Sequence, residues 1–332
     1  MSHRPLLLAA ALFTPCLFAP SASAYDAAAC AEREGELCDE NDAEEAAALA
    51  EDGGPEPVAP VRLAGSEDRH ERALKQALGG GNWGAEFRLV APDGRARPLA
   101  QVNNEVAMIP ASTMKLFTGW FGFIKEKEAR RRYPAPFRTF LAYAATMIKA
   151  SVNPMANLIL RLSGGAAAMT RFYAGLGLPT ESLVVADGAG LSARNRASAR
   201  LEVALLEHIK RSEHYAEFKA LMAEPGEAGT LRARLGDLAG RVHAKTGTLP
   251  RTGVASLAGF VDAGEAGVIV FSVIGNDRKI AVTAQRARID AAVRAVREGV
   301  LAEAAEAAVA VRRPAQVSPD LAGRLTAMVT TP

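Results

Sequence analysis

The sequence predicts an α+β fold, in which strands from both ends of the chain meet in one antiparallel sheet and a helical subdomain is inserted between them. The stretches with strand character are residues 86–91, 98–103, 241–248, 253–262 and 267–274. The stretches with helical spacing between them are residues 112–150, 154–162 and 201–209. This arrangement leaves a groove between sheet and helices, which is a common place for a functional site.

The first two strands are predicted to form a hairpin. Residues 86–91 alternate between apolar and polar side chains, the pattern of a strand with one buried face. Asp93-Gly94 supplies the turn into residues 98–103. A helix-like stretch at residues 67–77 precedes the hairpin.

The later elements are predicted from spacing and turn residues. Pro154 stands at the first position of the helix predicted over residues 154–162, with Asn153 as its candidate N-cap. Glycine-containing turns separate the three strands that follow residue 240. One face of a C-terminal helix is marked by Val282, Ile289, Val293, Val296 and Val300.

Residues 1–24 have the pattern of a signal peptide. Arg4 supplies the positive charge, residues 6–19 are apolar but too short to span a bilayer, and Ala22-Ser23-Ala24 fits a cleavage site. We therefore expect an exported protein. After the signal peptide we expect an acidic disordered leader or linker at residues 25–60, a main domain at residues 61–301 and an Ala-rich tail at residues 302–332. Cys30 and Cys38 of this leader either form a disulfide or have no structural role.

The composition allows a substantial core and disfavours two classes of protein. Hydrophobic residues make up 49% of the chain, and the formal net charge is +2. No stretch resembles a nucleic-acid-binding motif, and no later apolar run reaches the roughly 18 residues that a membrane helix needs. We therefore expect no nucleic-acid partner and no stable membrane span.

The first chemical motif is Ser112-Thr113-Met114-Lys115. On a helix, positions i and i+3 share a face, so Lys115 can reach the Ser112 hydroxyl. A serine hydroxyl is a poor nucleophile until a base takes its proton, and lysine serves as that base only when its pKa is lowered. The alternative is a helix start with an N-cap serine.

The second motif is Ser151-Val152-Asn153. In a catalytic interpretation, the Ser151 hydroxyl relays a proton between Lys115 and a leaving amine, and the Asn153 amide binds the substrate backbone. The alternative is that Asn153 only caps the following helix.

The third motif is Lys245-Thr246-Gly247-Thr248, a strand that carries a cation, two hydroxyls and a glycine. Such a strand can dock an extended peptide and hold its terminal carboxylate, and the glycine permits close approach of the substrate backbone. The alternative is an edge strand with a protective lysine.

The three motifs together, in this order, are a signature of β-lactamases and penicillin-binding proteins. The segment Pro110-Ala111-Ser112-Thr113-Met114-Lys115-Leu116 resembles the nucleophile motif of the penicillin-binding protein 4 type of D-Ala-D-Ala carboxypeptidase/endopeptidase. The loop Asp187-Gly188-Ala189-Gly190-Leu191-Ser192 is also typical of that family. The resemblance covers residues 86–300 and implies a β-lactamase/transpeptidase-like fold, with an antiparallel sheet flanked by helices.

The resemblance also implies a mechanism. Ser112, activated by Lys115, attacks the bond between two D-alanines at the end of a peptidoglycan stem peptide. The backbone N–H groups of Ser112 and Thr248 hold the oxyanion, and Ser151 and Lys245 pass a proton to the leaving group. The implied catalytic residues are Ser112, Lys115, Ser151, Asn153 and Lys245, and the implied substrate-binding residues are Thr246, Gly247 and Thr248.

The same resemblance implies inhibition by β-lactams and chemistry that needs no metal or organic cofactor. For an exported chain it favours the periplasm, with secretion into the medium as the alternative. The histidines have no ligand spacing. Asp187 and Ser192 either border the groove or only form a turn.

The chain also departs from the family pattern. Family members usually carry large domains between the first two motifs, whereas Ser112 and Ser151 are close in this sequence. Ala228 and Val152 replace residues that are usually acidic, and Pro250-Arg251 is an insertion. These changes concern substrate preference more than acyl transfer.

Two alternatives remain open from the sequence: a serine β-lactamase, which shares the motifs but needs rapid deacylation, and an inactive peptidoglycan-binding pseudo-enzyme. A Ser-His-Asp hydrolase is disfavoured because the chain has no Gly-x-Ser-x-Gly elbow.

Overall fold

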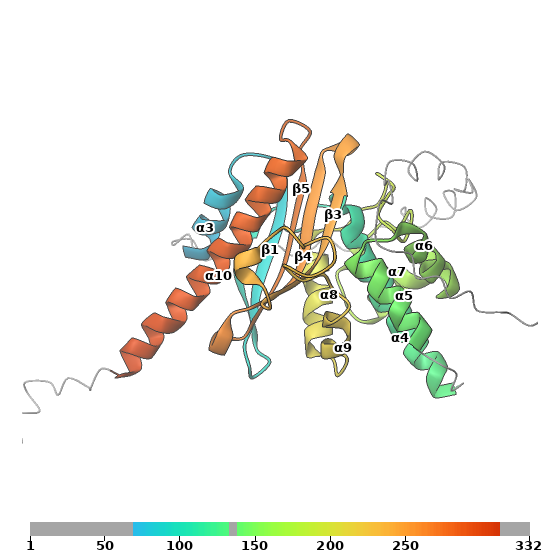
Figure 1. Ribbon diagram of the computed structural model, residues 1–332, viewed down its shortest axis with the longest axis horizontal. Helices are drawn as coiled ribbons and strands as arrows, with labels where there is room; N and C mark the ends of the chain where they lie inside the picture. Colours follow the sequence, from blue (N-terminus) through green and yellow to red (C-terminus); the bar gives the residue numbers. More distant parts are fainter. Residues whose placement is uncertain (1–68, 133–137, 313–332) are drawn as a thin grey trace, which may run out of the picture. The chain divides into compact units, whose positions relative to one another are not determined.

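The computed structural model describes residues 69–132 and 138–312 (Figure 1). Its centre is a five-stranded antiparallel sheet with the strand order β2-β1-β5-β4-β3. The strands are β1 (Trp83–Val90), β2 (Ala96–Val102), β3 (Val242–Leu249), β4 (Val254–Asp262) and β5 (Val268–Asn276). Because β1 pairs with β5, strands from both ends of the described chain meet in one sheet, as predicted.

β1 begins earlier than the predicted residue 86. One helix packs on one face of this strand, and on the other face Trp83 and Ala85 are buried in the core formed with two other helices. A strand buried on both faces lacks the polar alternation by which strands are found in a sequence. Gly84 also belongs to this strand, where a β-carbon would lie 2.6 Å from the sulfur of Met108.

Helices cover both faces of the sheet (Figure 1). α3 (Arg69–Leu78) and the long α10 (Val282–Arg312) pack together on one face, and α8 (Ala199–Arg211) packs against β1 and β5 on the other. The other α-helices of the described residues are α4 (Met114–Arg132), α5 (Arg138–Lys149), α6 (Asn153–Leu162), α7 (Gly165–Gly175) and α9 (Tyr215–Lys219). The predicted α+β class with a helical insertion is confirmed.

An apolar core lies on each face of the sheet. Successive residues of β5 divide between the two cores, with Val270 packing on the side of α4 and α8 and Phe271 on the side of α3 and α10. The Phe271 ring stacks on Phe87 at a centroid distance of 5.5 Å. The predicted face of the C-terminal helix is also confirmed, because Ile289, Val293, Val296 and Val300 are buried and Val282 is partly buried.

Several predictions about the chain ends are not tested by the structure. The signal peptide, the acidic leader and the residues beyond 312 lie outside the described residues, so the domain boundaries stay predictions. α10 continues past the predicted boundary at residue 301 to Arg312, with exposed side chains at residues 302–309. In the described part of the chain, no helix is long and apolar enough to cross a membrane.

Candidate active site

The candidate nucleophile lies in a 3-10 turn at the start of α4. Ser112 belongs to the turn η2 (Ala111–Thr113), which Pro110 flanks. Ser112 is therefore inside the turn and is not the N-cap considered from the sequence. One turn later, Lys115 places its Nζ 3.0 Å from Ser112 Oγ, so the contact predicted from the Ser-x-x-Lys spacing is present.

Lys115 is surrounded by neutral partners. Its Nζ also donates to Asn153 Oδ1 at 2.7 Å and to the carbonyl oxygen of Ala189 at 2.5 Å. The side chain is fully buried. This burial lowers the pKa of Lys115 to about 7, with the charge of Asp187 acting in the opposite direction. Around neutral pH, a large fraction of this lysine is therefore an uncharged amine.

An uncharged amine satisfies all three contacts of Lys115. It has two N–H donors and one lone pair, and both Asn153 Oδ1 and the Ala189 carbonyl can only accept hydrogen bonds. The lone pair is left for the Ser112 hydroxyl. This is the arrangement that a general base needs in order to take the serine proton.

A second buried lysine contacts the second motif. Lys245 on β3 donates from Nζ to Ser151 Oγ at 2.9 Å and to the Thr246 carbonyl at 2.7 Å. Burial lowers the pKa of Lys245 well below its usual range, and the charge of Lys115 lowers it further. Ser151 has a φ of 62°, a left-handed conformation that is uncommon for a residue with a side chain. Lys245 thus has the Ser151 hydroxyl as a direct partner and lies close enough to Lys115 to be affected by its charge.

The structure shows that Asn153 does not cap α6. The helix begins at Asn153 itself, after an extended Val152, and has no side-chain cap bond. The capping role considered from the sequence is wrong, because the Asn153 side-chain oxygen accepts a hydrogen bond from Lys115 instead.

Gly247 lets β3 pack against the turn that carries the nucleophile. A β-carbon on Gly247 would lie 2.1 Å from Ser256 Oγ, 2.7 Å from the Pro110 carbonyl and 3.0 Å from the Ser112 nitrogen. The sequence predicted this glycine for the approach of a substrate backbone, whereas the structure shows that the protein's own chain requires it. The same packing brings the β3 backbone beside the amide of Ser112, where the oxyanion hole was predicted.

The end of β3 contacts a residue that the motifs did not predict. Arg286 on α10 donates from Nη2 to Thr248 Oγ1 at 2.7 Å. Thr248 in turn donates to the Gly247 carbonyl at 2.7 Å. Lys245 is fully buried, so the alternative of a lysine that guards the sheet edge does not apply. Thr246 lies two positions before Thr248 on the same face of β3, so Thr246, Thr248 and Arg286 form a polar strip at the end of this strand.

Asp187 organises the loop that supplies the Ala189 carbonyl. Its carboxylate accepts backbone N–H groups of Ala189 at 2.8 Å, Gly190 at 2.6 Å and Ser192 at 2.6 Å. Asp187 thus forms the turn and also affects the site, because the turn points the Ala189 carbonyl at Lys115. Gly190, with φ of 82°, has no room for a side chain, since a β-carbon would lie 1.8 Å from the Ala111 carbonyl.

His208 and His243 make contacts outside the candidate active site. His243 pairs with Glu224 at 3.4 Å, and burial lowers the pKa of His243. The His208 ring packs edge-on against Trp120. Neither contact involves the three motifs.

The fold is of the β-lactamase/transpeptidase-like class, and it brings together residues of the three motifs that are a signature of β-lactamases and penicillin-binding proteins. Among solved structures, the chain is similar to the TLA-3 extended-spectrum β-lactamase, with 16% identity, a TM-score of 0.58, and coverage of 70% of this chain and 98% of that one. It is also similar to penicillin-binding protein 4 from Haemophilus influenzae complexed with a β-lactam, with 15% identity, a TM-score of 0.51, and coverage of 66% and 98%. At these identities the likeness establishes the fold.

The family relationship comes from the sequence comparisons. Residues 139–298 match the model of the D-Ala-D-Ala carboxypeptidase 3 (S13) family, which agrees with the resemblance that the motifs indicated. A D-alanyl-D-alanine carboxypeptidase from Actinomadura sp. (strain R39) is 38% identical over 109 residues. That match covers 31% of this chain and 20% of the relative, so it spans only a fifth of the relative's length.

The packing of β3 against the nucleophile turn leads to a prediction. Gly247→Ala is expected to reduce stability by about 1–3 kcal/mol, because the added methyl group overpacks the contact with Pro110 and Ser256. It is also expected to slow acylation of Ser112. Urea unfolding and the rate of labelling by a serine-directed reagent measure the two effects.

Gly236→Ala is the matched control, because a β-carbon at Gly236 has no heavy atom within 4 Å. Equal stability and labelling of Gly247→Ala and this control would contradict the packing role assigned to Gly247.

Proposed function

We propose that this chain is a serine D-Ala-D-Ala carboxypeptidase, or an endopeptidase of the same mechanism, that cleaves peptidoglycan stem peptides and is acylated by β-lactams. The observation that carries the proposal is the buried Lys115 amine, held by Asn153 and the Ala189 carbonyl with its free position toward Ser112 Oγ. The match to the S13 family supports the same activity.

The acylation step follows from this geometry. Lys115 takes the proton of Ser112, and the Ser112 oxygen attacks the carbonyl carbon between the two D-alanines. The oxyanion forms next to the amides of Ser112 and Thr248, each of which contributes roughly 10²–10³ in rate if it acts as such donors usually do. Collapse of the tetrahedral intermediate breaks the C–N bond and leaves an ester on Ser112.

The leaving D-alanine needs a proton on its nitrogen. Ser151 is the donor, because its hydroxyl lies 2.9 Å from Lys245 Nζ and can be reprotonated from that side. The proton taken by Lys115 returns through this lysine–serine pair. Water then attacks the ester and releases the shortened peptide.

The terminal carboxylate of the substrate is bound by the polar strip at the end of β3. Thr246 and Thr248 supply hydroxyls, and Arg286 adds a charged donor that already contacts Thr248 Oγ1. A guanidinium can bind a carboxylate through two parallel hydrogen bonds. The strip thus favours peptides with a free C-terminus.

The location and partners belong to the same proposal. The predicted signal peptide at residues 1–24 and the peptidoglycan substrate both support export, with the periplasm as the expected compartment.

A first prediction concerns covalent labelling. Intact-protein mass spectrometry after addition of benzylpenicillin is expected to show one drug molecule per chain, and Ser112→Ala is expected to show none. A parallel assay with an acyl-D-Ala-D-Ala peptide is expected to release D-alanine.

The other outcomes separate the alternatives. Unmodified protein with hydrolysed drug would identify a β-lactamase. Unmodified protein with intact drug and intact peptide would contradict an active enzyme and favour a peptidoglycan-binding pseudo-enzyme.

A second prediction concerns Arg286. Arg286→Ala is expected to raise KM about tenfold for a peptide with a free C-terminal carboxylate, since a hydrogen bond to a charged group is typically worth about 1.5–3 kcal/mol. A peptide with an amidated C-terminus should be affected far less. Steady-state kinetics on both peptides measure the difference.

Arg288→Ala is the control, because Arg288 lies on the same helix and donates to the carbonyls of Leu78 and Gly80 instead. An equal effect of the Arg286 change on both peptides would contradict carboxylate recognition.

A further inference from the structure

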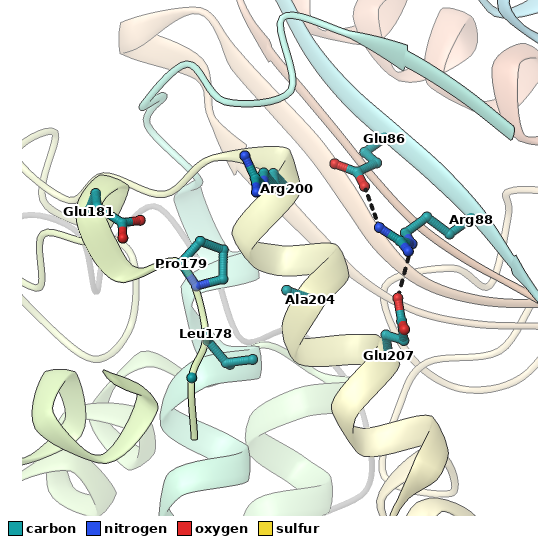
Figure 2. A pocket seen from close by; sticks show the side chains of 9 residues that line it. Glu86, Arg88, Leu178, Pro179, Glu181, Arg200, Ala204 and Glu207 are labelled. Carbon is teal, nitrogen blue, oxygen red and sulfur yellow. Dashed lines mark ion pairs between the residues drawn. The ribbon is translucent and has the colours of Figure 1, made fainter. Parts of the chain in front are cut away.

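Glu202 is a wholly buried carboxyl group behind the nucleophile turn. It lies on the inner face of α8, whereas Arg200, Ala204 and Glu207 line a pocket of about 440 Å³ on another side of the same helix (Figure 2). Residue 202 is half a helical turn away from residues 200 and 204, so its side chain points away from that pocket. Its surroundings are the sheet and the turn η2.

Both carboxyl oxygens of Glu202 contact hydroxyl groups. Oε1 lies 2.6 Å from Thr113 Oγ1, and Oε2 accepts from Ser272 Oγ on β5 at 2.7 Å. Thr113 follows Ser112 directly in the chain. Glu202 therefore connects the central sheet to the residue next to the nucleophile.

The charged groups around α8 have partners other than Glu202. On β1, Glu86 accepts from Asn104 at 2.8 Å, and Arg88 pairs with Glu207 at 3.0 Å (Figure 2). Lys115 on α4 is directed to its three neutral partners. The remaining titratable residues on packed elements are Asp262 of β4 and Tyr215, Glu217 and Lys219 of α9. Among the described residues, none of these groups forms an ion pair with Glu202.

The hydrogen positions in this cluster can be assigned by counting donors. Thr113 Oγ1 lies 2.8 Å from the Pro110 carbonyl, which can only accept. The single hydroxyl hydrogen of Thr113 satisfies that carbonyl, so Thr113 can only accept from Glu202 Oε1. A short contact between two oxygens requires a hydrogen between them, and here the carboxyl group must supply it.

The turn that this chain of hydrogen bonds supports is strained. Ala111 has a φ of 51°, a left-handed conformation that costs energy for a residue with a β-carbon. The Pro110 carbonyl before it accepts from Thr113 and also from Ser256 Oγ at 2.6 Å. These two hydrogen bonds fix the peptide that precedes Ala111 and Ser112.

We infer that Glu202 is a neutral carboxylic acid with its proton on Oε1, and that it is a positioning residue that holds the nucleophile turn through Thr113. If Glu202 ionised, Thr113 would turn its hydrogen to the carboxylate and release the Pro110 carbonyl. Burial supports the neutral form, because it raises the pKa of Glu202 to about 7. The inference rests on the proposed role of Ser112 as the acylated nucleophile.

The test compares the pH dependence of Ser112 acylation by benzylpenicillin in the wild type and in Glu202→Gln. Deprotonation of Lys115 raises the rate and ionisation of Glu202 lowers it, and both groups have a pKa of about 7. The wild-type rate is therefore expected to pass through a narrow maximum near pH 7. Gln cannot ionise, but it donates to Thr113 and accepts from Ser272. Glu202→Gln is therefore expected to lose the alkaline decline and to keep the acidic one.

Two substitutions of Thr113 keep the inference testable if Glu202→Gln does not fold. Thr113→Val has a similar shape and no hydroxyl, and it is expected to acylate about tenfold more slowly, since a buried donor and acceptor lose their partner. Thr113→Ser is expected to retain the wild-type rate. Glu207→Gln, the same change on the outer side of α8, is expected to leave the pH profile unchanged.

Infrared difference spectroscopy provides a direct signature. The wild type is expected to show a carboxylic-acid C=O band near neutral pH that is absent from Glu202→Gln. The inference is overturned if the band is unaffected, if the alkaline decline persists in Glu202→Gln, or if Thr113→Val acylates at the wild-type rate. Complete absence of acylation in the wild type would instead contradict the proposed function.

Discussion

The site depends on the burial of one lysine amine without a counter-ion. Lys115 of α4 is buried and reaches the Asp187 loop, and its hydrogen-bond partners are all neutral groups. Desolvation disfavours the charged form of the amine and so lowers its pKa to about 7, at which a lysine can act as a base near neutral pH. An acidic partner in direct contact would cancel this effect. Asn153 and the Ala189 carbonyl satisfy the amine without stabilising its charge.

The rest of the architecture keeps Ser112 where that amine can act. β3 packs against the turn η2 at Gly247. The Asp187 loop packs against the same turn at Gly190, so a glycine permits the close backbone contact on each side. Hydrogen bonds also connect this turn to the sheet. Ser256 of β4 donates to the Pro110 carbonyl, and Glu202 connects Thr113 of the turn to Ser272 of β5. Because the sheet joins both ends of the described chain, the nucleophile is held by elements that are distant in the sequence.

The sequence predicted the parts of this site that depend on short-range spacing. Ser112 and Lys115 are three positions apart on a helical turn, and their contact follows from helix geometry. Arg286 and Glu202 have no such pattern, since they reach Thr248 and Thr113 only through the packing of α10 and α8 on the sheet. For Asn153, the capping alternative followed from local rules, which cannot foresee its contact with Lys115 from another helix. Gly247 was predicted to be necessary, but the reason found in the structure is a tertiary contact.

Because its pKa is about 7, Lys115 is expected to lose its proton around neutral pH, and an NMR titration of its Nζ measures this without relying on catalysis. In protein labelled with ¹⁵N-lysine, the resonance that is lost in Lys115→Arg identifies Lys115. This nitrogen is expected to titrate with a midpoint near pH 7, and the acidic limb of Ser112 acylation is expected to have the same midpoint. A lysine that stays protonated up to about pH 10, as an exposed lysine does, would contradict this expectation.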